Sequence, residues 1–301
     1  MTSPFTLDNQ AAYQAWRKQK LANTPDYRHA DPNNLFIHIS DPNQLSPAEQ
    51  QLIANACKHT NMALYRLAEH SIESDKKAIL KFAKQLGLKR LDHNLCADDD
   101  DLTSITHTKH QGQHNYIPYS TKRLSWHTDG YYNTKDHQIH GILLHCAMPA
   151  KSGGESLLLD HEIAYILLRD ENPDYIKAFM QDDAMTIPAN TLDGKTIREA
   201  QTGPIFSING NGRLHMRYSA RKRNIEWKQN AHTLEAAAFL DALWEQAKKG
   251  ESPHVLRYTL QAGEGLVCNN ILHCRTAFED FDDPTKKRLL YRGRYFDHIN
   301  M

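Results

Sequence analysis

The sequence predicts a mainly β protein with flanking helices, folded as a barrel or a double-sheet jelly roll. The first observation is a series of short β-rich runs separated by turn signals, at residues 139–147, 155–159, 204–208, 213–219, 254–260, 265–269 and 287–296. The second is Asn209-Gly210-Asn211-Gly212, a strong hairpin signal between two of these runs. Many short strands with few interrupting helices favour a closed or double-sheet β architecture.

Helices are expected mainly near the N-terminus, where residues 1–90 have mostly helical patterns and are predicted to pack on a jelly-roll core at about 92–301. Ser46-Pro47-Ala48-Glu49 is a capping-box pattern with proline at the first helical position, and predicts a helix from there to about Leu67. Further helices are expected at residues 8–22, 74–86, 161–180 and 232–249. The 301 residues are expected to form a single domain.

Composition predicts a cytoplasmic protein with no nucleic-acid or membrane partner. The 36 basic residues balance 36 acidic ones, so no charge excess calls for a polyanion. The five cysteines are odd in number and include no Cys-x-x-Cys pair, which argues against a disulfide framework and a structural zinc site. No signal-peptide pattern begins the chain, and no run approaches the roughly 18 apolar residues of a membrane helix.

The segment His127-Thr128-Asp129 is the first candidate for a metal site. In an extended chain both side chains point the same way, with Cα atoms about 7 Å apart. Two histidines and one carboxylate form the facial triad of non-heme Fe(II) oxygenases. The pair is weak evidence alone, because His29-Ala30-Asp31 repeats it in what we interpret as a solvated turn.

A second histidine must then come from a later strand. The candidates are His215, His254, His273 and His298. We choose His273, because residues 266–268 read as a buried strand after a turn, and residues 269–273 as its continuation across the same sheet. His215 is the second choice.

Two arginines near the C-terminus suggest an anion site. Arg288 and Arg292 are four positions apart, so on a strand they share a face at a separation of about 13 Å. A guanidinium in a barrel interior is costly without an anionic partner, and a bound dicarboxylate would be such a partner. The polar stretch from Asp92 to His114, with histidines 107, 110 and 114, is interpreted as a solvated loop at the rim of the site.

Together these motifs resemble the taurine dioxygenase (TauD/TfdA-like) family of Fe(II)/2-oxoglutarate-dependent oxygenases. The resemblance covers about residues 75–301 and implies a double-stranded β-helix (jelly roll). The second half is most similar to the γ-butyrobetaine and trimethyllysine hydroxylase branch. The motifs that carry the resemblance are His127-x-Asp129, Leu144-His145-Cys146, Gly153-Gly154-Glu155-Ser156, Arg217-Tyr218-Ser219, His273-Cys-Arg-Thr-Ala-Phe278 and Arg288.

The resemblance implies that His127, Asp129 and His273 hold Fe(II), which 2-oxoglutarate chelates. Arg288, helped by the Ser156 hydroxyl, would bind the distal carboxylate of 2-oxoglutarate, with Arg292 as the alternative. An aspartate at the carboxylate position favours hydroxylation over halogenation.

The implied activity is oxidation, most often hydroxylation, of an unactivated C–H bond of a small polar metabolite such as an amino acid, betaine or related amine, with O₂ as cosubstrate. Arg292, Arg217 and Tyr131 are the candidates for substrate binding, although Arg292 could equally support Arg288, and ordinary packing also explains the tyrosines. Three alternatives stay open: a desaturase or cyclase with the same cofactors, a zinc-dependent hydrolase, and a non-catalytic jelly-roll binding protein. A homo-oligomer is possible.

Overall fold

The computed structural model describes residues 3–69, 75–92, 102–107, 117–192 and 194–299. Most of the polar rim stretch, including histidines 110 and 114, lies outside these residues. Contacts divide the chain into two compact units. The first contains Met1–Arg28, Ser125–Gln138 and Leu159–Val255, and the second contains His29–Leu124, Ile139–Leu158 and Leu256–Met301.

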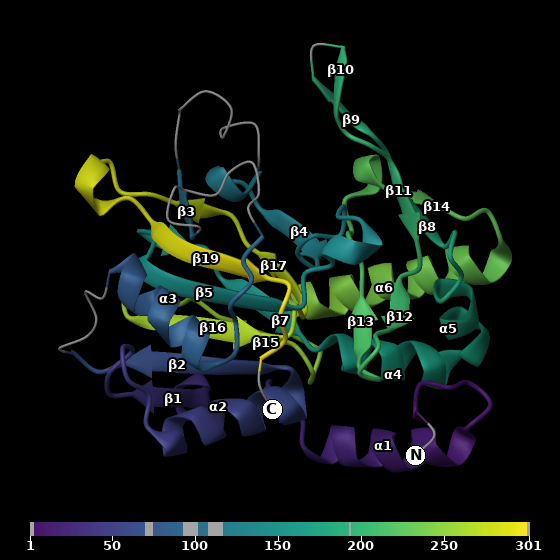
Figure 1. Cartoon of the computed structure of the whole chain (residues 1–301). Coiled ribbons are helices and arrows are strands. Elements are labelled where there is room, and N and C mark those ends of the chain that lie inside the picture. The colour runs from purple at the N-terminus through teal and green to yellow at the C-terminus, as the bar shows by residue number, and fades with distance from the viewer. Residues whose placement is uncertain (1–2, 70–74, 93–101, 108–116, 193, 300–301) are drawn as a thin grey trace. The chain divides into compact units, whose positions relative to one another are not determined.

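A six-stranded sheet forms the centre of the second unit (Figure 1). Its first two strands are parallel, and the other neighbours run antiparallel. The order is β1 (Phe36–Ile39), β2 (Met62–Leu67), β16 (Glu264–Cys268), β5 (Gly141–Met148), β19 (Leu289–Tyr295) and β3 (Thr103–Thr106).

The two faces of this sheet carry different clusters because strand side chains alternate. One face packs against α2 (Pro47–Thr60) and α3 (Lys76–Gln85) in a large apolar core that includes Phe82, Leu143 and Tyr295. The opposite face carries a smaller cluster with Cys146 and Leu290. Arg288, just before β19, and Arg292, within it, are each two positions from Leu290. The alternation of side chains along a strand therefore places them on the same face as Leu290, away from the helices.

The predicted capping box is present, but the helix that it opens ends earlier than expected. Ser46 and Glu49 cap each other, and Asn61, in the left-handed region with φ 56°, ends α2 after Thr60. The prediction of a helix to Leu67 is wrong: residues 62–67 form β2, paired on both sides by β1 and β16. Sheet pairing with distant segments outweighs the local helical pattern there.

A second sheet has the strand order β15 (Leu256–Tyr258), β7 (Ser156–Leu159), β17 (Leu272–Arg275) and β4 (Leu124–His127). The expected continuation from residues 266–268 to His273 across one sheet is therefore wrong, since β16 and β17 belong to different sheets. Asn270, with φ 50°, lies in the turn between them, and its side chain donates to the carbonyl of Ile139 at 2.7 Å. A short antiparallel pair is formed by β6 (Ser152–Gly153) and β18 (Phe278–Glu279).

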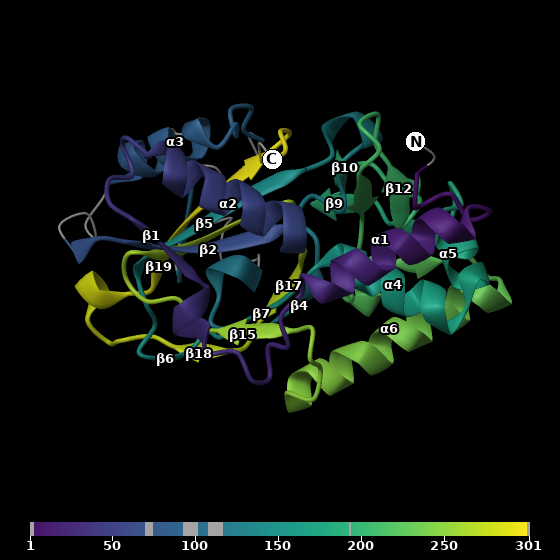
Figure 2. The ribbon, with the colours of Figure 1, turned by 90° about the horizontal axis from the view of Figure 1, so that it is seen from below.

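The first unit combines helices with short strands (Figure 2). Its helices are α1 (Gln10–Ala22), α4 (His161–Glu171), α5 (Pro173–Phe179) and α6 (Ala231–Lys249). One sheet of this unit has the strand order β11 (Gln201–Gly203), β8 (Met185–Ile187) and β14 (Glu226–Trp227). Two further sheets have two strands each: β9 (Asn190–Leu192) pairs with β10 (Lys195–Arg198), and β12 (Phe206–Ile208) pairs with β13 (Leu214–Met216).

The single helix predicted at residues 161–180 is two helices. Asn172 is extended, with φ −158° and ψ 115°, and its side chain caps α5 at Asp174. Proline at position 173 disfavours a helical residue before it and suits the first helical position after it. Each of the seven predicted β-rich runs does contain a strand, and the helix expected at 232–249 is present as α6, which ends at the left-handed Gly250.

Short 3₁₀ helices complete the described elements, at η1 (Pro32–Leu35), η3 (Ile117–Tyr119), η4 (Lys135–His137), η5 (Lys222–Asn224) and η6 (Pro284–Lys286). Among the helices that the structure describes, none has both the length and the apolar surface to cross a membrane.

Candidate metal centre

The end of β4 and the turn after it hold His127 and Asp129 in fixed positions. Thr128 donates its backbone N–H to the Tyr218 carbonyl at 3.0 Å, and the Tyr218 N–H donates to the Thr128 hydroxyl at 3.1 Å. Gly130, with φ 68°, then turns the chain. Because two hydrogen bonds join Thr128 to Tyr218, the residue between the two candidate ligands is held in place.

The imidazole of His127 is arranged as a neutral nitrogen ligand. Its Nδ1 lies 2.9 Å from the carbonyl of Ser125, so an N–H there donates to a backbone oxygen and leaves the Nε2 lone pair available. Nε2 is 3.6 Å from Oδ1 of Asp129. Both side chains are buried, at 7% and 5% relative exposure, which shields a bound ion from bulk water.

His273 on β17 has the same arrangement. Its Nδ1 lies 3.0 Å from the carbonyl of Ile271, so an N–H there donates to the backbone and Nε2 is the nitrogen that carries the lone pair. One ligand atom from each of His127, Asp129 and His273 lies within 4.8 Å of the other two. Two ligands about 2.1 Å from one ion at right angles are roughly 3 Å apart, so the three donors fit one metal after small adjustments.

The structure thus brings together the three residues chosen from the sequence. The other histidine candidates, His215, His254 and His298, are not members of this cluster. The donor set of two imidazoles and one carboxylate suits a divalent transition metal such as iron. Trp126, next to His127, is a core residue: it is 3% exposed and stacks on Trp244 with 4.7 Å between ring centroids.

Arg288 is a buried cation at the start of β19. Its side chain is 6% exposed, and its guanidinium carbon lies 4.9 Å from the centroid of the Phe278 ring. Its backbone N–H donates to Asp280 at 2.7 Å. Burial lowers the pKa of Arg288, against the opposing effects of Cys146 and Asp280, but an arginine remains charged at neutral pH.

Arg275 lies on Phe278 as well, with its guanidinium carbon 4.7 Å from the ring centroid. It donates to the carbonyls of Pro118, Ser120 and Lys122. Burial, and then the charge of Arg288, lower the pKa of Arg275 to about 9. Sequence reasoning quoted Arg275 only as part of a motif and missed its packing on Phe278, which depends on residues distant in the chain.

The Gly153-Gly154 turn lies close to Arg288 in the second unit. Gly154 has φ 75°, and a Cβ there would lie 3.7 Å from Nε of Arg288. Ser156 begins β7, opposite Tyr258. Arg292 is opposite Leu144 on one side of β19 and Thr103 on the other. The predicted roles of Ser156 and Arg292 remain predictions.

Arg217, expected to bind substrate, is engaged by main-chain carbonyls. Its guanidinium donates to Gly203 at 2.8 Å, Pro204 at 3.2 Å, Gln201 at 3.3 Å and Tyr131 at 3.4 Å, and also to Met185. The side chain is 6% exposed, and burial lowers its pKa to about 10. This arrangement favours an anchoring role over direct substrate binding.

Of the four tyrosines Tyr119, Tyr131, Tyr132 and Tyr218, two are core residues. Tyr119 and Tyr218 are 2% and 1% exposed, and the Tyr218 hydroxyl accepts from Nε1 of Trp244 at 2.8 Å. Tyr131 is half-buried and meets the His127 ring edge-on, with 6.3 Å between ring centroids. Tyr132 follows, 5.1 Å from Tyr131.

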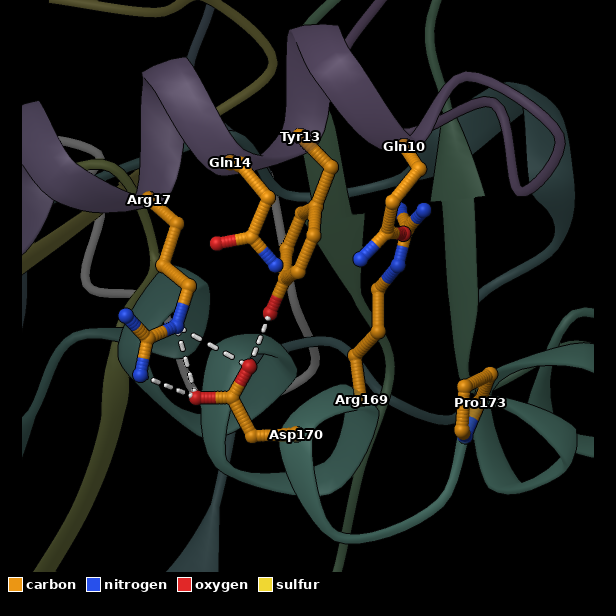
Figure 3. A pocket seen from close by; sticks show the side chains of 7 residues that line it. All are labelled: Gln10, Tyr13, Gln14, Arg17, Arg169, Asp170 and Pro173. Atoms are coloured by element: carbon orange, nitrogen blue, oxygen red, sulfur yellow. Dashed lines mark hydrogen bonds and ion pairs between the residues drawn. The ribbon is translucent and has the colours of Figure 1, made fainter.

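A surface hollow of about 490 Å³ in the first unit has a different character (Figure 3). It lies between α1 and α4, and Tyr13 and Arg17 in it both bind Asp170. Tyr13 donates to Asp170 at 2.7 Å, and Arg17 forms an ion pair with the same carboxylate at 2.6 Å. The hollow contains none of the predicted site residues, so we assign it no role in the reaction.

Comparison with known proteins gives a family and two curated relatives. The family described as "Taurine catabolism dioxygenase TauD, TfdA family" matches residues 22–294. A uridine-5'-phosphate dioxygenase of Streptomyces sp is 30% identical over 202 residues, covering 66% of this chain and 71% of the relative. Another, from Amycolatopsis sp, is 26% identical over 282 residues, covering 87% and 96%. These relatives do not support the expected γ-butyrobetaine and trimethyllysine hydroxylase branch.

Solved structures agree on the fold. An asparagine oxygenase in complex with Fe(II), 2S,3S-3-hydroxyasparagine and succinate has a TM-score of 0.57 at 13% identity, covering 87% of this chain and 86% of that chain. A taurine dioxygenase from Burkholderia xenovorans has 0.54 at 19%, covering 87% of each. The non-heme iron oxygenase OrfP has 0.60 at 15%, covering 83% and 81%. These likenesses confirm the predicted double-stranded β-helix with flanking helices.

Proposed function

Because the chain belongs to the taurine catabolism dioxygenase TauD, TfdA family of Fe(II)/2-oxoglutarate-dependent dioxygenases, we propose that it oxidises a C–H bond of a small anionic metabolite, with nucleoside 5'-phosphates as the first substrate class. The observation that carries the proposal is the cluster of His127, Asp129 and His273. Bound Fe(II) with 2-oxoglutarate and O₂ would supply the oxidising chemistry there.

The three clustered side chains are the proposed iron ligands. Each histidine donates from Nδ1 to a backbone carbonyl, which fixes its ring and directs Nε2 toward the shared position. Asp129 offers one negative charge, which offsets part of the charge of a divalent ion. A facial set of three ligands leaves positions open for cosubstrates, as an oxygenase requires.

Arg288 is the proposed partner of the distal carboxylate of 2-oxoglutarate. Among the described residues, no ion pair or hydrogen bond to its guanidinium is found, although the side chain is buried. A buried cation of this kind is strongly stabilised by a bound carboxylate, which an arginine holds through two parallel hydrogen bonds. The Ser156 hydroxyl is the proposed second donor, and Arg292 is the alternative cation.

The substrate proposal follows the identity of the relatives. The two uridine-5'-phosphate dioxygenases are 26–30% identical to this chain, whereas the oxygenases that act on asparagine and arginine derivatives are 13–15% identical and indicate the fold alone. Nucleoside 5'-phosphates therefore come first, and amino acids, betaines and related amines second. Arg292, on the Arg288 side of β19, is the proposed partner of an anionic substrate group.

Succinate release tests this proposal. Iron-loaded protein would be supplied with 2-oxoglutarate, O₂ and, in turn, uridine 5'-phosphate, uridine, amino acids and betaines. We expect uridine 5'-phosphate to stimulate succinate formation, and the mass of the product to distinguish hydroxylation from desaturation or cyclisation. Stimulation by an amino acid, with none by uridine 5'-phosphate, would make amino acids the substrate class. Turnover without O₂ and 2-oxoglutarate would support a zinc hydrolase instead.

A further inference from the structure

A row of three side chains leads away from the candidate ligand His127 within the first unit. The Tyr131 ring meets the His127 ring at 85°, and Tyr132 meets Tyr131 at 79° with 5.1 Å between centroids. The guanidinium carbon of Arg198, on β10, lies 5.6 Å from the Tyr132 ring centroid. Two aromatic rings and one cation therefore extend from the edge of the metal centre.

Arg198 is held in place and keeps donors to spare. Nη2 donates to the Pro188 carbonyl at 2.8 Å, and Nη1 donates to the Glu199 carbonyl at 3.3 Å. Among the described residues, no carboxylate forms an ion pair with it, and the side chain is half-buried. Because a guanidinium has five N–H groups, several remain to bind a ligand.

Arg217 fixes both sides of this row. It binds the carbonyl of Tyr131 and the carbonyls of Gln201 and Gly203 on β11, the strand that follows Arg198 in the chain. The tyrosines and the strand that follows Arg198 are thus tied to one buried cation. A surface fixed in this way loses little entropy when it binds a ligand.

We propose that Tyr131, Tyr132 and Arg198 are the specificity-determining residues of the proposed reaction, and that they recognise the planar ring of a pyrimidine nucleotide. Tyrosine faces stack on a flat heterocycle, and Arg198 donates to its carbonyl oxygens. A phosphate would use the cation but gains nothing from two aromatic rings. The inference depends on the proposed nucleotide substrate.

The test compares two ligands that differ only in the ring. Titration calorimetry would measure the Kd of uridine 5'-phosphate and of ribose 5-phosphate, using anaerobic full-length protein loaded with Fe(II) and 2-oxoglutarate. In Arg198→Met and Tyr132→Leu we expect the uridine 5'-phosphate Kd to rise, by roughly 5- to 150-fold for the lost stacking partner. The ribose 5-phosphate Kd should stay unchanged.

Two controls make the result specific. Lys195→Met removes an exposed cation from the same strand and should leave both Kd values unchanged. The visible band of the iron and 2-oxoglutarate complex should persist in every variant, which would show that the metal centre is folded.

Three outcomes would overturn the inference. Equal weakening of both ligands by Arg198→Met would assign Arg198 to the phosphate, and unchanged binding of uridine 5'-phosphate would remove it from the site; either result leaves the proposed substrate standing. Failure of the unmodified protein to bind uridine 5'-phosphate at all would overturn the substrate class, and with it the ring-binding role.

Discussion

Replacing Arg217 by methionine should destabilise the first unit strongly. Keeping this guanidinium charged in the interior costs free energy, because burial lowers its pKa to about 10, a shift that corresponds to about 3 kcal/mol. The five carbonyl acceptors offset that cost. Methionine fills similar volume but leaves the carbonyls of Met185 and Gly203, the two closest acceptors, without this donor.

An unpaired buried carbonyl costs about 1–3 kcal/mol, so we expect the free energy of unfolding to fall by about 3–5 kcal/mol. Equilibrium unfolding in urea, followed by tryptophan fluorescence, measures this change. Arg223→Met, at an exposed position on η5, is the control and should change stability by less than about 0.5 kcal/mol. A loss below about 1 kcal/mol in Arg217→Met would refute the anchoring role.

Three further predictions concern the second unit. Burial lowers the pKa of His145 from the usual 6.5 to about 4, so the unfolded chain binds the proton more tightly than the folded one. The free energy of unfolding should therefore fall as the pH drops from 6.5 to 4. Urea titrations at several pH values should show that His145→Gln removes up to about 3 kcal/mol of this pH dependence. Arg288→Ala should raise the Kd of 2-oxoglutarate at least about tenfold, because hydrogen bonds to charged groups contribute about 1.5–3 kcal/mol. Ser156→Ala should raise this Kd less. Equal effects of the two substitutions would argue against Arg288 as the main partner of the distal carboxylate. Phe278→Leu should raise the same Kd while leaving the affinity for Fe(II) unchanged, because Phe278 contacts the guanidinium of Arg288; a loss of iron binding would contradict this.

The cluster of His127, Asp129 and His273 was predictable because part of the pattern is local. His127 and Asp129 face the same way at a spacing of two, whichever strands lie beside them. His273 was chosen correctly for the cluster through a wrong route, since the left-handed turn at Asn270 moves the chain into another sheet. Sequence reasoning selected His273 but did not predict that β17, on which it lies, belongs to a second sheet.

The errors arose where distant contacts decide the structure. Residues 62–67 have a helical pattern locally but form β2 because β1 and β16 pair with it. The carbonyls around Arg217 come from three separate segments, at Tyr131, Met185 and residues 201–204, so its anchoring could not be predicted from its neighbours in the chain. The break at Asn172 was signalled by Pro173 and was within reach of the sequence.

The central claim is that His127, Asp129 and His273 bind one Fe(II), which 2-oxoglutarate completes. Its most direct test is the anaerobic addition of Fe(II) and 2-oxoglutarate to metal-free protein, with visible difference spectroscopy. We expect a weak metal-to-ligand charge-transfer band that disappears in His127→Ala and His273→Ala but persists in His254→Ala, a half-buried histidine outside the cluster. Absence of the band from the unmodified protein, or its survival in His273→Ala, would show that these three residues do not form the iron site.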